Sequence, residues 1–188
     1  MNTKPDILLA DDHSRLDEML DQVFGALSDR DCRATLICLD HLWARLAMHI
    51  RAEHLHLFPI LLQKASDPNL LMLAGEALSR LPVIIPALRR DHDFFVREIG
   101  KDVNYLRGRG RDVREPVIVD LLEVQKNLTI VAQMLEVHNE LEENEVYPLA
   151  RSLLTSEEID SLMASILREL KNVPQRFRND STDVYKPR

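Results

Sequence analysis

Residues 124–149 read VQKNLTIVAQMLEVHNELEENEVYPL, and this stretch decides the fold. Its apolar residues recur at intervals of three and four, which is the spacing of one face of an α-helix. His138 and Glu142 lie on the same face, in places where that spacing predicts an apolar side chain. The whole face consists of Val124, Leu128, Val131, Leu135, His138, Glu142, Val146 and Leu149. The sequence therefore predicts a long helix that begins near Pro116 and carries two polar residues on its buried face.

Three further long helices are expected from the same spacing. They are residues 6–28, a run from the polar connector 28–31 to about residue 64, and residues 83–107. Glycine is scarce, with 5 residues in 188, and aromatic residues make up 5% of the chain. This balance is typical of helical proteins that are rich in leucine and alanine. We therefore predict an all-α protein.

Two short helices and a tail complete the predicted fold. Residues 70–81 form a leucine-rich run that the following proline is expected to end, and a capping box at Thr155 starts a helix that reaches about residue 170. The chain beyond that helix has few apolar residues. We predict an up-down-up-down four-helix bundle with short accessory helices in residues 1–171, and a flexible C-terminal tail in residues 172–188.

Charge and composition exclude several classes of partner. The formal net charge is -7 and the isoelectric point is about 5.5, so the chain lacks the basic surface that nucleic-acid binding requires. The apolar run at residues 7–10 is too short for a signal peptide or a membrane span. Cys32 and Cys38 lie six residues apart in a helical stretch, too far for a disulfide. We expect a cytoplasmic protein with no nucleic-acid or membrane partner.

An internal repeat contains the residues that can carry chemistry. Residues 49–60, HIRAEHLHLFPI, match residues 138–149, HNELEENEVYPL, and both begin with His-x3-Glu. A histidine and a glutamate four residues apart lie on one helix face, so both can bind one metal ion, and the second carboxylate oxygen can bridge to another ion. His49 and Glu53 of the first copy thus correspond to His138 and Glu142 of the second.

The other two long helices contribute one histidine each, His13 and His92, also on their apolar faces. Burying an ionised carboxylate costs several kcal/mol unless it is paired or bound to a metal. Four helices around one axis would bring all six side chains to a central pair of metal ions, about 3.5–4 Å apart. The sequence predicts a dinuclear site with nitrogen and oxygen ligands and no thiolate.

The remaining histidines are weaker candidates. His56 follows Glu53 by three residues and His49 by seven, so we expect it near the inward face as a possible extra ligand. His54 lies beside that face, and we expect it at the edge of the bundle; His41 is expected to be structural.

The set of residues resembles the hemerythrin-like, or HHE cation-binding, family over about residues 13–149. The matching features are a histidine in each of the first and third long helices, and His-x3-Glu followed by Phe-Pro or Tyr-Pro in the second and fourth. The resemblance implies a non-haem di-iron centre. In it the terminal ligands are His13, His49, His92 and His138, and the bridging carboxylates are Glu53 and Glu142.

The chain departs from the oxygen-carrying members in two places. In the third helix of those members, a second histidine follows the first by four residues, where this chain has Val96. They also use an aspartate, one residue farther on, where this chain has Glu142. Unless His56 completes the coordination, one iron has an open position.

Three hypotheses for the function follow. In the first, the protein binds, senses or reacts with a small oxidant or diatomic: O2, NO or peroxide. In the second, it is an oxidoreductase that consumes peroxide or O2. In the third, it is a regulatory protein whose C-terminal tail contacts a partner when the site holds metal. Two iron ions are expected, although histidine and carboxylate ligands also accept Mn or Zn.

Overall fold

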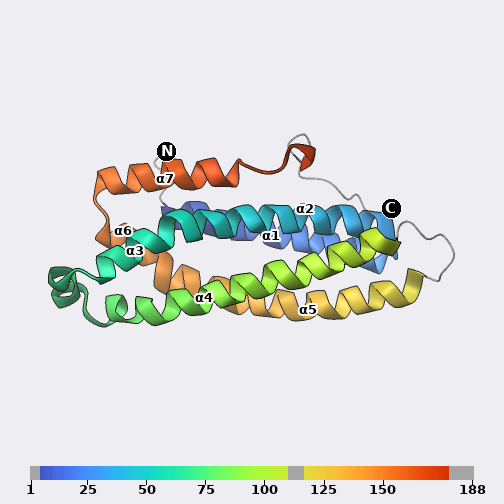
Figure 1. The fold of residues 1–188 in the computed structure, drawn as a ribbon, viewed down its shortest axis with the longest axis horizontal. Coiled ribbons are helices and arrows are strands. Elements are labelled where there is room, and N and C mark those ends of the chain that lie inside the picture. Colours follow the sequence, from blue (N-terminus) through green and yellow to red (C-terminus); the bar gives the residue numbers. More distant parts are fainter. Residues whose placement is uncertain (1–4, 110–116, 178–188) are drawn as a thin grey trace.

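The computed structural model describes residues 5–109 and 117–177, and within these ranges every regular element is helical. Figure 1 shows long helical rods lying side by side, with a further helix along one side. The elements in chain order are α1 (Pro5–Ser28), α2 (Cys32–Ala52), the π-helix η1 (Glu53–Leu57), α3 (Phe58–Ala65), α4 (Pro68–Arg109), α5 (Val117–Leu141), the π-helix η2 (Glu142–Val146), α6 (Tyr147–Leu153), α7 (Ser156–Leu170) and the 3-10 helix η3 (Gln175–Phe177).

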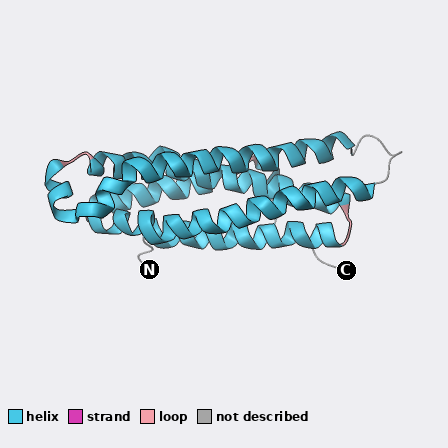
Figure 2. Ribbon diagram, turned by 90° about the horizontal axis from the view of Figure 1, so that it is seen from below, coloured by secondary structure: helices cyan, strands magenta, loops and turns pink. Residues whose placement is uncertain are grey.

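Four rods form the bundle: α1; α2 with η1 and α3; α4; and α5 with η2 and α6. Helix α1 packs on α2, α2 on α4, α4 on α5, and α5 on α1. The rods lie nearly parallel to one axis when the molecule is turned (Figure 2). Short connections reverse the chain; at the first of them the Asp31 carboxylate accepts a hydrogen bond from the Ala34 N–H and caps α2. The predicted all-α four-helix bundle is confirmed.

Helix α4 corrects the prediction for residues 70–107. A short helix ended by Pro82 was expected, but a single helix of 42 residues passes through Pro82 and Pro86. Both prolines are exposed, while Leu78, Leu81 and Ile85 are completely buried. The apolar face therefore continues past the prolines, and its burial offsets a cost of about 3 kcal/mol for each proline in a helix interior.

The second and fourth rods are interrupted by one π-helical turn each, which the sequence analysis did not predict. The Phe58 N–H donates to the Glu53 carbonyl, and the Tyr147 N–H to the Glu142 carbonyl, each five residues back. A proline follows in both cases, and a proline has no N–H and crowds the carbonyl four residues before it. The wider turn relieves this crowding.

Helix α7 lies against the outside of the bundle, beside α2, η1 and α1 (Figure 1). The predicted capping box is present, with Thr155 and Glu158 exchanging side-chain and backbone hydrogen bonds. Beyond α7, Phe177 is buried and stacks on His41, with ring centroids 4.9 Å apart. Residues 178–188 of the predicted tail lie outside the described residues. Among the described helices, none combines the length and apolar composition that a membrane span requires.

The buried core has two apolar parts. One part contains Leu16, Leu46, Phe95 and Leu128. The other contains Leu9 and lies nearer the opposite end of the rods. Between the two parts, every rod carries a buried polar residue. This polar layer contains the candidate site.

Candidate metal centre

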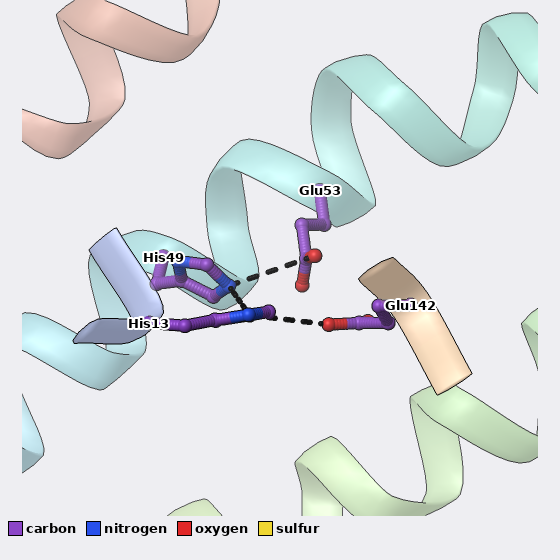
Figure 3. A group of neighbouring side chains, drawn as sticks. All are labelled: His13, His49, Glu53 and Glu142. Carbon is purple, nitrogen blue, oxygen red and sulfur yellow. Dashed lines mark hydrogen bonds and ion pairs between the residues drawn. The ribbon is translucent and has the colours of Figure 1, made fainter. Parts of the chain in front are cut away.

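Six side chains converge in the polar layer, all of them predicted from the sequence. Each is at most 4% exposed. They are His13 on α1, His49 on α2, Glu53 at the start of η1, His92 on α4, His138 on α5 and Glu142 at the start of η2. Figure 3 shows four of them pointing toward one another from three rods.

The histidines form two pairs that face each other through their Nε2 atoms. His13 Nε2 lies 3.0 Å from His49 Nε2, and His92 Nε2 lies 2.8 Å from His138 Nε2. The first pair joins α1 to α2 and the second joins α4 to α5. Each half of the bundle thus supplies one pair.

Each glutamate offers one oxygen to each histidine pair. Glu53 Oε1 is 3.6 Å from His49 Nε2, whereas its Oε2 is 3.3 Å from His92 Nε2. Glu142 Oε2 is 3.4 Å from His13 Nε2, whereas its Oε1 is 3.2 Å from His138 Nε2. A carboxylate oriented in this way can bridge two metal ions.

Two of these carboxylate oxygens have an unusual environment. Glu53 Oε2 and Glu142 Oε1 are buried, and neither accepts a hydrogen bond within the described part of the chain. A buried carboxylate oxygen without a donor is costly, and a bound cation would satisfy it. Four imidazole nitrogens and two such carboxylates are ligands that iron, manganese and zinc accept. The residues therefore fit a metal centre.

The comparison with protein families agrees with this geometry. The family model described as hemerythrin HHE cation binding domain matches residues 5–150. The chain belongs to this family. The match confirms the resemblance drawn from the sequence, and it makes the His/Glu cluster of this HHE domain the candidate cation-binding site. No curated protein and no solved structure gives a significant match.

The HHE domain orients all four imidazoles by the same device. Each Nδ1 atom contacts a side chain that lies outside the cluster, and each Nε2 atom therefore points inward. The Nδ1 partners are Glu143 for His13 at 2.7 Å, Asp12 for His49 at 3.0 Å, His54 for His92 at 2.9 Å and Asp91 for His138 at 3.4 Å. Such outer partners fix the orientation of metal-binding histidines and raise their basicity.

These outer partners were missed in the sequence, although a signal for them exists. Asp12 precedes His13 and Asp91 precedes His92, so the first and third long helices share an Asp-His pair. In each, the histidine enters the cluster and the aspartate holds the histidine of the next rod. Asp12 is also paired with Arg45, which is largely buried. The repeated Asp-His pair could have been recognised.

The structure corrects the placement of His56 and adds a contact for His54. His56 does not join the cluster; its Nε2 lies 3.8 Å from Glu169 Oε1, on the side facing α7. The wide π-turn that begins at Glu53 rotates the following residues away from the positions expected for an α-helix. His54, expected at the edge of the bundle, is half-buried and contacts His92.

Tyr147 is a further residue that the sequence analysis did not assign. Its hydroxyl lies 2.6 Å from Glu53 Oε1, 3.1 Å from Glu142 Oε2 and 3.1 Å from His13 Nε2. It occupies the repeat position equivalent to Phe58, and both rings are buried. The sequence repeat reveals that Tyr147 and Phe58 are equivalent. The contacts of the Tyr147 hydroxyl depend on how the rods pack, which the repeat does not reveal.

The charges of the cluster are mutually dependent. Burial lowers the pKa of His49, but the Glu53 and Asp12 carboxylates outweigh it and raise that pKa to about 10. Burial alone would raise the pKa of Glu142, but the neighbouring His13 and His138 imidazoles outweigh it and lower that pKa. Without metal, a protonated His49 thus faces the Glu53 and Asp12 carboxylates. Metal binding at its Nε2 would displace that proton.

Proposed function

We propose that this HHE domain holds two iron ions and uses them to bind, sense or react with a small oxidant or diatomic: O2, NO or peroxide. One ion is assigned to His13 and His49, the other to His92 and His138, with Glu53 and Glu142 bridging. The observation that carries the proposal is the arrangement of the two carboxylates, each with one oxygen toward each histidine pair. When bound, an iron pair supplies redox chemistry and positions for small ligands.

The number of metal ligands that the protein supplies favours reaction with a small molecule over reversible storage of O2. Four imidazole nitrogens and four carboxylate oxygens supply four donors to each ion, fewer than an octahedral ion takes. Val96 lies one helical turn after His92, and its side chain packs against the apolar core instead of reaching the cluster. Positions not filled by the protein are open to exogenous ligands.

The surroundings of the cluster suit a small ligand. The apolar core on both sides excludes bulk water from the polar layer. On one side, His13 and Glu143 line a surface groove of about 470 Å³, together with Asp17, Glu136 and Glu140. The groove brings solvent to the edge of the cluster.

Rapid mixing of the anaerobic, iron-loaded and reduced protein with O2 tests the proposal. Fast oxidation is expected, without a spectrum that forms under O2 and reverses under argon. Val96→His adds a donor one turn after His92 and should slow the oxidation. Val83→His is the matched control, because Val83 is exposed on the same helix and should leave the rate unchanged. A long-lived spectrum that reverses under argon would contradict the proposal.

A further inference from the structure

The two halves of the cluster differ in one aromatic residue. Phe58 and Tyr147 each lie five residues after a cluster glutamate, at the end of a π-turn. The Phe58 ring stacks on His92, with ring centroids 6.0 Å apart and planes 8° apart, and it offers only carbon atoms. The Tyr147 ring stacks on His13 at 5.6 Å and brings a hydroxyl into the cluster. The repeat is therefore chemically asymmetric.

The Tyr147 oxygen lies among the donor atoms of the first histidine pair. Two donors at right angles, each about 2.1 Å from one ion, are about 3.0 Å apart. The hydroxyl lies 3.1 Å from both Glu142 Oε2 and His13 Nε2, which is the distance expected between ligands of one ion, and it donates a hydrogen bond of 2.6 Å to Glu53 Oε1. Tyr147 is 1% exposed, so the hydroxyl has no access to bulk water.

Among residues 5–109 and 117–177, no such hydroxyl oxygen contacts the second pair. The two carboxylate oxygens that lack a hydrogen-bond donor, Glu53 Oε2 and Glu142 Oε1, are the ones that face His92 and His138. Their counterparts on the other side contact Tyr147. The Phe95 ring also lies edge-on to His138, with centroids 5.2 Å apart. The second pair thus has apolar walls and fewer donors.

We infer that Tyr147 supplies its phenolic oxygen as a fifth protein ligand to the metal held by His13 and His49. The metal held by His92 and His138 then has the fewer protein donors, four against five, and is where exogenous ligands bind more tightly. The inference rests on the proposed function, because it requires metal in the site. When the metal binds, the phenolic O–H bond breaks, a metal–oxygen bond forms, and the proton leaves to the buffer. Neutral diatomics suit the apolar walls of the remaining position.

Spectroscopy of the iron(III)-loaded protein tests the tyrosine. The wild type should show a visible phenolate-to-iron(III) charge-transfer band with resonance-enhanced tyrosinate vibrations. Tyr147→Phe should lose both while its iron content, measured on the same samples, stays the same. Tyr105→Phe, a tyrosine of α4 away from the cluster, is the control and should keep both. Iron without the band, or a band that survives in Tyr147→Phe, overturns the inference alone; absence of iron from the wild type overturns the proposed function as well.

Titration of the reduced protein with NO tests which position is open. The wild type should bind one NO per chain tightly and a second at least tenfold more weakly, and Tyr147→Phe should bind two with similar affinity, because the first position then loses its fifth donor. Phe58→Tyr places a hydroxyl on the ring that stacks on His92 and should weaken NO binding at least tenfold. Circular dichroism shows whether each variant is folded. Two equally tight NO per wild-type chain, or no gain in affinity at the second NO in Tyr147→Phe, would refute the assignment of the more open position.

Discussion

Replacing Asp12 with asparagine should weaken metal binding through His49. Asp12 is 4% exposed, lies 3.0 Å from His49 Nδ1 and is paired with Arg45. Asparagine keeps the shape but removes the charge, so it leaves Arg45 without its ion pair and His49 with a less basic ring. Loss of such an outer partner costs about 10–100-fold in metal affinity, or about 1.4–2.7 kcal/mol.

The Asp-His pair of the third long helix provides a matched control in Asp91→Asn. Asp91 contacts His138 as Asp12 contacts His49, but Asp91 Oδ2 lies 3.4 Å from His138 Nδ1 and the Asp91 side chain is 38% exposed. An exposed pair of this kind contributes at most about 1 kcal/mol, so the loss should stay below about fivefold. Anaerobic titration with Fe(II) against a chromogenic chelator at pH 7 measures both affinities. Equal losses in the two variants, or no loss in Asp12→Asn, would refute the reasoning.

Two other changes have defined outcomes. His49→Leu and His138→Leu should each abolish metal binding at their own pair while circular dichroism keeps the wild-type helical signal, because leucine suits the buried face; normal metal content in both would count against the ligand assignment. Burial raises the pKa of Asp102 to about 6, above its usual 3.8, so its ionisation destabilises the fold as pH rises from about 4 to 6. Asp102→Asn can still bond Asn127 and should raise the unfolding free energy by up to about 3 kcal/mol at pH 8 but little at pH 3.5. Denaturant unfolding at both pH values would show the difference, and an equal gain at each would contradict the assignment.

The sequence predicted the cluster because buried charge is rare on a helix face. His13, His49, His92 and His138 interrupt apolar stripes, and the spacing of three and four is sufficient to place them inside. Glu53 and Glu142 follow from the same spacing, one turn after a histidine. All six positions could therefore be read from local periodicity.

The errors arose where tertiary structure overrides local patterns. Pro82 ends a helix in isolation, but here the burial of Leu78, Leu81 and Ile85 keeps α4 continuous. The π-turn at Glu53 turns His56 outward, and periodicity alone does not reveal it.

The contacts of the outer partners depend on packing between rods, which no spacing along one helix encodes. Asp12 holds a histidine of the next rod, and Tyr147 reaches a glutamate of the second rod. Neither contact involves a neighbour on the same helix face. Comparison of the first and third long helices would have suggested the Asp-His pairs, but not their partners.

The most direct test of a dinuclear centre is the number and position of metal ions in the protein loaded anaerobically with Fe(II). Metal analysis should give about two irons per chain, and anomalous diffraction should locate them about 3.5–4 Å apart, one beside each histidine pair. A single ion, or two ions outside the layer formed by Glu53 and Glu142, would contradict the account.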